Sequence, residues 1–142
     1  MTSAGYLLDT NALSEPVRRM PAPAVTAFMA AIRDDETFLS VLTVGELRRG
    51  ATMRRQTDSR HAARIDTWID VVERRFAGRI LSVDLEIADL WGKLSAERPR
   101  PVVDALLAAT AIVHDLTLVT RNVADFADTG VALVNPWTVK LR

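Results

Sequence analysis

Cysteine is absent from the 142 residues of this chain. Disulfide bonds and thiolate metal sites are therefore excluded, and a chain without cysteine suits a reducing compartment. No stretch approaches the roughly 20 apolar residues that a membrane-spanning helix needs. The first residues, Met1 to Gly5, lack the basic and apolar segments of a signal peptide. We therefore expect a cytoplasmic protein that does not enter membranes.

Positive charge is not in excess either, because 18 basic residues balance 18 acidic ones. With zero net charge, no overall field attracts a polyanion, so a nucleic-acid function has to depend on a local site. Lysine is scarce: only Lys93 and Lys140 occur, and the other basic residues are arginines. Arginine binds phosphate through two parallel hydrogen bonds, but genomic base composition explains the same bias.

The sequence does contain strand-like and helix-like segments that alternate along one expected domain, residues 1–142. Residues 10–20 predict a short helix or turn that Pro16 interrupts. Continuous apolar runs predict strands at 6–8, 38–42, 80–83, 116–120 and 131–134. Helical spacing predicts helices at 23–32, 43–55, 58–76, 84–94 and 102–114. This alternation indicates an α/β fold in three layers, with a central parallel sheet of about five strands flanked by helices.

Acidic residues lie where such a sheet would bind ligands, at the carboxyl ends of the strands. Asp9 directly follows the first strand, and Glu46 lies in the first turn of the helix after the second. Asp104 lies in the first turn of the helix before the fourth strand, so this helix start has to reach the same edge. Asn122 and Asp125 follow the fourth strand. Carboxylates that converge in this way repel one another and need protons or a cation.

The donor types indicate which cation would bind. Mg²⁺ and Mn²⁺ prefer carboxylate oxygens, whereas Zn²⁺ prefers the thiolates and paired histidines that this sequence lacks. Such an ion can generate hydroxide near neutral pH and stabilise charge that develops on a phosphodiester. The predicted reaction class is phosphodiester hydrolysis.

Each acidic candidate also has a structural explanation. Asp9 can cap a turn, since Asp-Thr-Asn is turn-prone. Glu46 can close a capping box with Thr43. Asp104 can serve as an anion at a helix start, and Asp125 can be a solvated loop residue.

The basic and aromatic residues also allow two interpretations. Arg48 and Arg49 follow Glu46 on one helix, where they form either a solvated surface or a contact to the RNA backbone. His61 and His114 have no ligand-like spacing, so we interpret both as structural. The tryptophans have the placement of core or interface residues.

Seven ordered blocks resemble the PIN-domain ribonucleases, specifically the FitB-like branch of VapC-type toxins from toxin–antitoxin pairs. Together they cover nearly the whole chain. The blocks are Leu7-Leu8-Asp9-Thr10-Asn11, Ser14-Glu15-Pro16, residues 42–50, residues 76–81, residues 104–111, residues 116–122 and Asn135-Pro136-Trp137.

The resemblance implies a mechanism and partners. Asp9 and Asp104 match the family's principal metal ligands, and Glu46 matches its third acidic position. Members cut RNA by hydrolysis with Mg²⁺ or Mn²⁺ and usually form homodimers. A small cognate antitoxin inhibits them by inserting a C-terminal segment, often with an arginine, and larger heteromers with the antitoxin can assemble on operator DNA.

One position departs from the family pattern. Many members have aspartate directly after Thr-Arg at the end of the fourth strand, where this chain has Asn122. Its amide oxygen brings no charge, and Asp125 is the candidate to compensate. Thr120 matches a family position near the pocket, with Asn11 as a further supporting residue. Arg121, like Arg48 and Arg49, is a candidate RNA contact.

The leading hypothesis is a metal-dependent endoribonuclease, the toxin of a type II toxin–antitoxin system, with Asp9, Glu46 and Asp104 as catalytic residues. The alternative is a catalytically weak PIN-like binding module that acts through its antitoxin and DNA complex. A receiver-type signalling domain would need a paired acid and a late lysine, which are missing. Haloacid-type phosphatases need a second aspartate where Asn11 stands.

Overall fold

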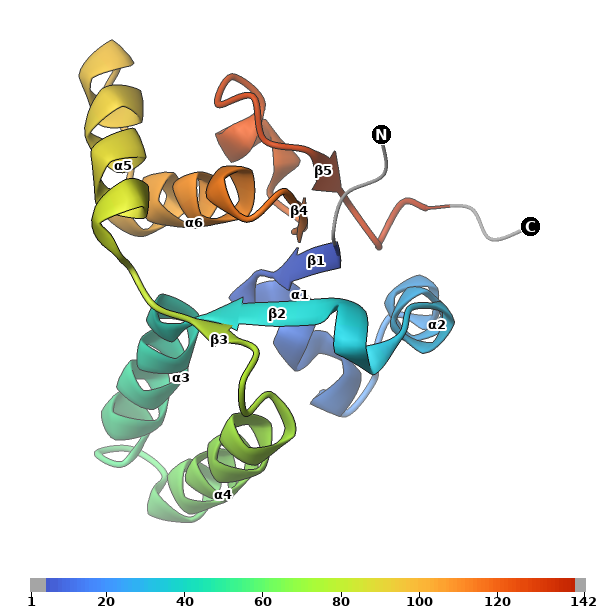
Figure 1. The fold of residues 1–142 in the computed structure, drawn as a ribbon. Coiled ribbons are helices and arrows are strands. Elements are labelled where there is room, and N and C mark those ends of the chain that lie inside the picture. The colour runs from blue at the N-terminus through green and yellow to red at the C-terminus, as the bar shows by residue number, and fades with distance from the viewer. Residues whose placement is uncertain (1–4, 140–142) are drawn as a thin grey trace.

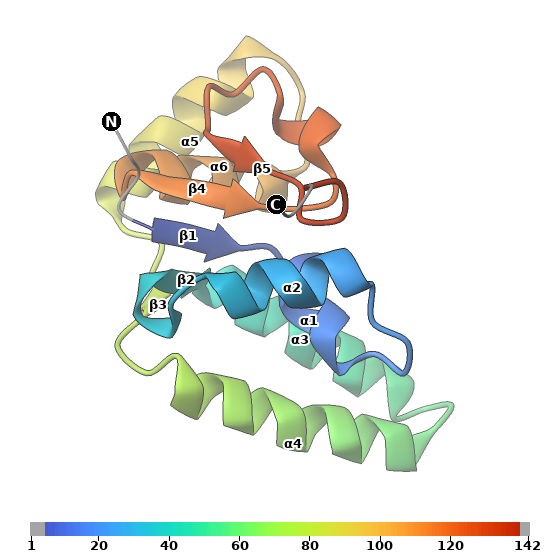
Figure 2. The same ribbon diagram turned by 90° about the vertical axis from the view of Figure 1, so that its right-hand side faces the viewer.

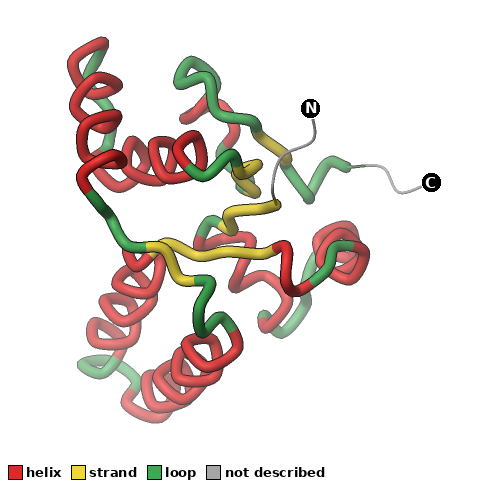
Figure 3. The backbone as a smooth tube through the Cα atoms, viewed as in Figure 1, coloured by secondary structure: helices red, strands yellow, loops and turns green. Residues whose placement is uncertain are grey.

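The computed structural model describes residues 5–139 and contains one parallel sheet with the strand order β3-β2-β1-β4-β5 (Figures 1 and 3). The first strand therefore lies at the centre of the sheet, between β2 and β4. The strands are β1 (Gly5–Leu8), β2 (Thr37–Ser40), β3 (Ile80–Leu81), β4 (Leu116–Val119) and β5 (Leu133–Val134).

Helices cover both faces of the sheet, so the prediction of a three-layer α/β fold is confirmed (Figures 1 and 2). One face carries α5 (Leu85–Glu97) and α6 (Val102–Val113). The other face carries α1 (Thr10–Ser14), α2 (Pro23–Ala31), α3 (Val41–Arg54) and α4 (Ser59–Arg75). Short 3₁₀ turns are η1 (Glu15–Val17), η2 (Asp34–Glu36) and η3 (Val123–Phe126). Within residues 5–139, none of the helices is both long enough and apolar enough to cross a bilayer.

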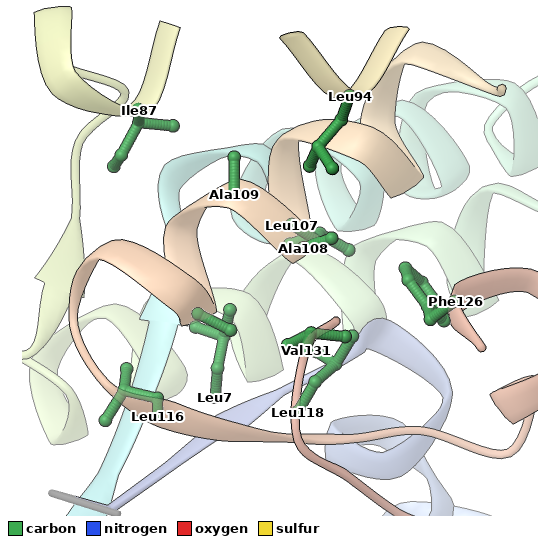
Figure 4. Packing of buried hydrophobic residues seen from close by; sticks show 11 residues of the cluster. Leu7, Ile87, Leu94, Leu107, Ala108, Ala109, Leu116, Leu118, Phe126 and Val131 are labelled. Carbon is green, nitrogen blue, oxygen red and sulfur yellow. The ribbon is translucent and has the colours of Figure 1, made fainter. Parts of the chain in front are cut away.

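Two hydrophobic cores form because successive strand residues point to opposite faces of the sheet. Leu7 and Leu118 pack with α5 and α6, as Figure 4 shows, whereas Leu8 and Val119 pack with α1, α3 and α4. All four side chains are fully buried. Each contributes about 1.5–3 kcal/mol through removal of apolar surface from water. This explains why the two central strands consist of continuous apolar residues.

The beginning of α3 differs from the prediction. We expected the second strand to run to Leu42 and a helix to start at Thr43. The strand ends at Ser40, whose hydroxyl accepts a hydrogen bond from the Leu42 backbone N–H at 3.0 Å and caps the helix. Thr43 lies inside α3 with its hydroxyl buried, so the predicted capping box between Thr43 and Glu46 is wrong.

Three other strands are shorter than predicted. The third and fifth contain two residues each, and the fourth ends at Val119. Apolar runs at 80–83 and 131–134 continue beyond the paired residues, because hydrophobicity does not reveal where backbone pairing stops.

The connection between α6 and β4 determines where Asp104 lies. His114 and Asp115 separate the two elements, and Asp115 has a φ of 53°, a left-handed conformation suited to a tight reversal. Because the turn is so short, α6 returns along the sheet antiparallel to β4. The beginning of α6, with Asp104 in its first turn, therefore lies at the carboxyl edge of the strands.

Candidate active site

Asp9 is held at the carboxyl edge by hydrogen bonds to both of its carboxylate oxygens. Oδ1 accepts from the Thr10 backbone N–H at 2.8 Å, and Oδ2 accepts from the Thr120 hydroxyl at 2.8 Å. The first bond caps α1, so the capping role is real. Asp9 is only 8% exposed and Thr120 is fully buried. The carboxylate of Asp9 thus has a fixed orientation, set by residues from β1 and β4.

Glu46 approaches this edge from α3. Its Oε1 accepts a hydrogen bond from the Thr10 hydroxyl at 2.9 Å. Thr10 is therefore the link between Asp9, through its backbone, and Glu46, through its side chain. The Glu46 side chain is exposed, and one oxygen remains for other contacts.

Asp104 is the acid whose ionisation the surroundings disfavour. Burial raises the pKa of its carboxyl above the ordinary value, and the negative charges of Asp9, Asp125 and Glu46 raise it further. The four carboxylates therefore share one electrostatic neighbourhood. In the described part of the chain, none of the four forms an ion pair with an arginine, lysine or histidine.

The carboxylates are neighbours without forming a tight ligand cage. Among residues 5–139, no three Asp, Glu, His or Cys side chains are close enough to hold one ion directly. Mg²⁺ keeps several waters and binds proteins through one or two carboxylates. The donor set therefore fits a hydrated Mg²⁺ or Mn²⁺ that some acids contact through water.

The polar residues after β4 are held by the same hydrogen-bond network. The Asn122 backbone N–H donates to the Thr120 hydroxyl at 3.1 Å, and the Asn11 Oδ1 accepts from the Arg121 backbone N–H at 3.3 Å. The side chain of Asn122 is exposed, and Asp125 lies in η3 within electrostatic range of Asp104. Both supporting asparagines and Asp125 thus lie along the carboxyl edge.

Arg48 has a structural role. Its guanidinium contacts Asp66 at 3.0 Å, Asp70 at 2.5 Å and Glu73 at 3.0 Å, which joins α3 to α4. These contacts occupy the donors that would reach phosphate, so we withdraw Arg48 as a candidate RNA contact. Arg49 and Arg121 are exposed, and neither forms an ion pair within the described residues.

The sequence interpretation missed three contributors. Thr10 was only part of a motif, yet its hydroxyl joins Glu46 to the edge. Asn135 and Trp137 also appeared only as a motif, but Asn135 contacts Arg121 and the Trp137 ring lies under the Arg121 guanidinium. These contacts join residues 14 to 36 positions apart, and such contacts leave no periodic signal in a sequence.

Comparison with known proteins identifies the family. The family model for the PIN domain matches residues 6–131. The chain belongs to the PIN-domain family. The PIN-domain relatives include "Toxin FitB" of Neisseria gonorrhoeae, 32% identical over 136 residues that cover 92% of this chain and 97% of the relative. "VapC ribonuclease Y4jK" of Sinorhizobium fredii is 31% identical, with 92% of this chain and 96% of the relative covered.

Solved PIN-domain structures agree with the fold. FitAcB from Neisseria gonorrhoeae superposes with a TM-score of 0.86 at 31% identity, over 94% of this chain and 99% of that chain. FitAB bound to an IR36 DNA fragment gives a TM-score of 0.82 at 30% identity, over 96% of this chain and 98% of that chain. This PIN domain therefore lies in the FitB-like branch of the VapC-type toxins.

Proposed function

We propose that this PIN domain is a metal-dependent endoribonuclease that acts as the toxin of a type II toxin–antitoxin pair. The observation that supports this best is the raised pKa of Asp104 beside Asp9, Asp125 and Glu46. Carboxylates that repel one another so close to a fixed Asp9 create a demand for a divalent cation. The name of the relative "VapC ribonuclease Y4jK" supports RNA as the substrate.

In this proposal, Asp9 and Asp104 hold Mg²⁺ or Mn²⁺, and Glu46 completes the site directly or through water. The ion, when bound, supplies a low-pKa water and charge stabilisation at a phosphodiester. Thr120 and the Thr10 backbone keep both oxygens of Asp9 oriented. Glu46, fixed by the Thr10 hydroxyl, has an oxygen available to orient the attacking water and accept its proton.

Asn11, Asn122 and Asp125 have supporting roles in this proposal. Asn11 fixes the backbone after β4, and Asn122 offers an amide oxygen without charge. Asp125 supplies the negative charge that Asn122 lacks on this side of the site.

The experiment is RNA cleavage by the wild-type chain and by Asp9→Asn, with Mg²⁺, Mn²⁺ or a chelator. Asparagine retains an acceptor for the Thr10 N–H, so the fold should persist while cleavage falls by about 10²-fold or more. Asp89→Asn is the matched control, because Asp89 is an exposed acid on α5. Full cleavage by Asp9→Asn, or by the chelated wild type, would refute the proposal.

The second candidate is a catalytically weak binding module that acts through an antitoxin and DNA complex. Two observations favour it: Asn122 lacks charge, and no three described acids form a direct ion cage. Calorimetric titration with Mn²⁺ separates the candidates. Saturable binding that Asp9→Asn abolishes supports the enzyme, and the absence of binding supports the module.

We also propose that a cognate antitoxin docks in a groove of about 690 Å³ between η1, α3 and α4. Thr10 and Glu46 are among its lining residues, and Val17, Leu47 and Trp68 give it an apolar part. An amphipathic antitoxin segment could bury its apolar residues here, with an arginine beside Glu46. Val17→Asp, at a 58% exposed position, should weaken co-purification with the antitoxin while RNA cleavage persists. Unchanged co-purification would contradict this docking site.

Assembly is proposed from the resemblance alone. We propose a homodimer that can form larger complexes with the antitoxin on operator DNA, as the relative FitAB is found bound to a DNA fragment. Sedimentation of the purified chain, with and without the antitoxin, tests this assembly.

A further inference from the structure

An acidic active site needs local cations to attract RNA, and eight of the sixteen arginines of this chain are engaged elsewhere. Seven arginines form ion pairs with carboxylates, and Arg79 donates to backbone carbonyls of η2 and β2. Arg121, like Arg49 and Arg74, is exposed and forms no ion pair among residues 5–139, and it is the one of these three that lies beside the acidic edge. It is also adjacent to Thr120, which contacts Asp9.

The backbone of Arg121 is fixed from both sides. Its N–H donates to the Asn11 side chain at 3.3 Å, and its carbonyl accepts from Asn135 Nδ2 at 3.4 Å. The flanking residues are fixed as well, because the Thr120 hydroxyl donates to Asp9 and accepts from the Asn122 N–H. The Cα of Arg121 therefore keeps a constant position relative to the Asp9 carboxylate.

The side chain of Arg121 is supported by an aromatic ring. Its guanidinium carbon lies 5.2 Å from the centre of the Trp137 ring, within the range of a cation–π contact. Asn135 holds both members of this pair, since its Oδ1 accepts from the Trp137 N–H at 2.9 Å while its amide donates to Arg121. Trp137 is also partly buried and packs against the core that contains Leu8 and Val119, so it is a stable platform.

We infer that Arg121 binds a backbone phosphate of the RNA substrate and that Trp137, with Asn135, is the positioning residue that holds its guanidinium ready. This inference rests on the proposed ribonuclease function and deepens it. An aromatic ring leaves the in-plane N–H donors of arginine free, whereas a carboxylate partner would occupy them. Stacking also reduces the side-chain entropy that arginine would lose when it binds phosphate.

The test measures binding of a fluorescein-labelled single-stranded RNA of mixed sequence by anisotropy in EDTA, where the proposed mechanism allows no cleavage. Arg121→Gln should weaken binding about tenfold, the value of one charge-assisted hydrogen bond. The slope of log affinity against log salt should fall in magnitude by about 0.7, as expected when the protein neutralises one phosphate fewer on a single strand. Arg74→Gln is the control, because Arg74 is exposed at the end of α4 near the opposite edge of the sheet.

Trp137 is tested through its dependence on Arg121. Trp137→Leu should weaken RNA binding in the wild-type background but add nothing in Arg121→Gln, because the ring acts through the arginine. Trp137→Phe keeps an aromatic face and should retain most of the affinity, and it replaces the leucine variant if that variant does not fold. Mn²⁺ binding by calorimetry should stay unchanged in all of them.

Two results would overturn the inference. The first is RNA affinity of Arg121→Gln equal to that of the wild type or of Arg74→Gln. The second is an additive effect of Trp137→Leu in the Arg121→Gln background. Failure of the proposed function is a separate outcome, since a wild type that never cleaves RNA leaves this binding comparison intact.

Discussion

Two groups of carboxylates in this molecule have opposite electrostatic surroundings. At the α3–α4 interface, Arg48 and Arg55 hold the pKa of Asp66 below its ordinary value. At the carboxyl edge, burial and neighbouring carboxylates hold the pKa of Asp104 above its ordinary value. Aspartate therefore joins two helices through ion pairs at the α3–α4 interface. At the carboxyl edge it carries negative charge that no basic residue in the described part of the chain neutralises. The first arrangement stabilises the fold, and the second is the signature of a binding site.

The largest expected effect comes from neutralising the carboxyl edge. Asp104→Asn should lower RNA cleavage by about 10²-fold or more, because it removes a proposed metal ligand. In EDTA its free energy of unfolding should equal or exceed that of the wild type, since a repelled charge is removed. Cleavage assays and urea unfolding of the same preparation measure both quantities. A clear loss of stability in EDTA would show that the Asp104 charge is structurally favourable.

Loss of the hydroxyl that orients Asp9 should have the next largest effect. Thr120→Val keeps the side-chain shape but removes the donor to Asp9 Oδ2, so Mn²⁺ affinity should fall about 10- to 100-fold. Thr110→Val is a matched control, because that buried hydroxyl donates within its own helix, to the Leu106 carbonyl. Calorimetry on both variants measures the difference. An equal loss of Mn²⁺ affinity in Thr120→Val and Thr110→Val would contradict the orienting role of Thr120.

The paired carboxylates should respond in the opposite way. Arg48→Met leaves Asp66, Asp70 and Glu73 facing one another, and we expect a loss of about 1–2 kcal/mol in the free energy of unfolding. This value is below that of a buried pair because the Arg48 side chain is 35% exposed. Arg49→Met, at an exposed neighbouring position, should cost little stability. Urea unfolding compares the two, and a gain in stability for Arg48→Met would contradict the prediction.

The smallest effect concerns pH. The folded-state pKa of Asp66 is lowered, so its contribution to stability is present above its ordinary value of 3.8 and is lost as pH falls through the lowered value. Asp66→Asn should therefore show a shallower loss of stability in acid than the wild type. Unfolding midpoints measured in EDTA between neutral and acidic pH give the slope of stability against pH for each protein. If stability depends on pH equally in the wild type and in Asp66→Asn, the ion pairs of Asp66 with Arg48 and Arg55 do not stabilise the fold.

The fold was predictable because its central strands are continuous apolar runs and its helices alternate with them. Leu7 and Leu8 each face a separate core, which is why the run has no polar alternation. Strand ends were less predictable: apolar residues continue past Ser40 as Val41 and Leu42, and only the Ser40 cap shows where the helix begins. Local composition carries no information about that hydrogen bond.

The candidate site was partly predictable for the same reason. Asp9 follows β1 directly and Glu46 lies on the helix after β2, so the rule for parallel sheets places them near one edge. The position of Asp104 depends on the tight turn at Asp115. No pattern in the sequence predicts that turn. The contacts of Arg48 with α4, and of Asn135 with Arg121, depend on how distant segments pack. Those contacts could be found only in three dimensions.

The central position of β1 has a consequence for the time at which the protein can act. The bond between Thr120 and Asp9 spans 111 residues, and β1 pairs with β4 along its whole length. During translation, Asp9 leaves the ribosome long before Thr120, and it receives its orienting hydroxyl only after the residues that separate the two have been synthesised. A nascent polypeptide without β4 thus lacks an organised site, and a cell that makes this protein is not exposed to its proposed activity until β4 has been synthesised and has paired with β1.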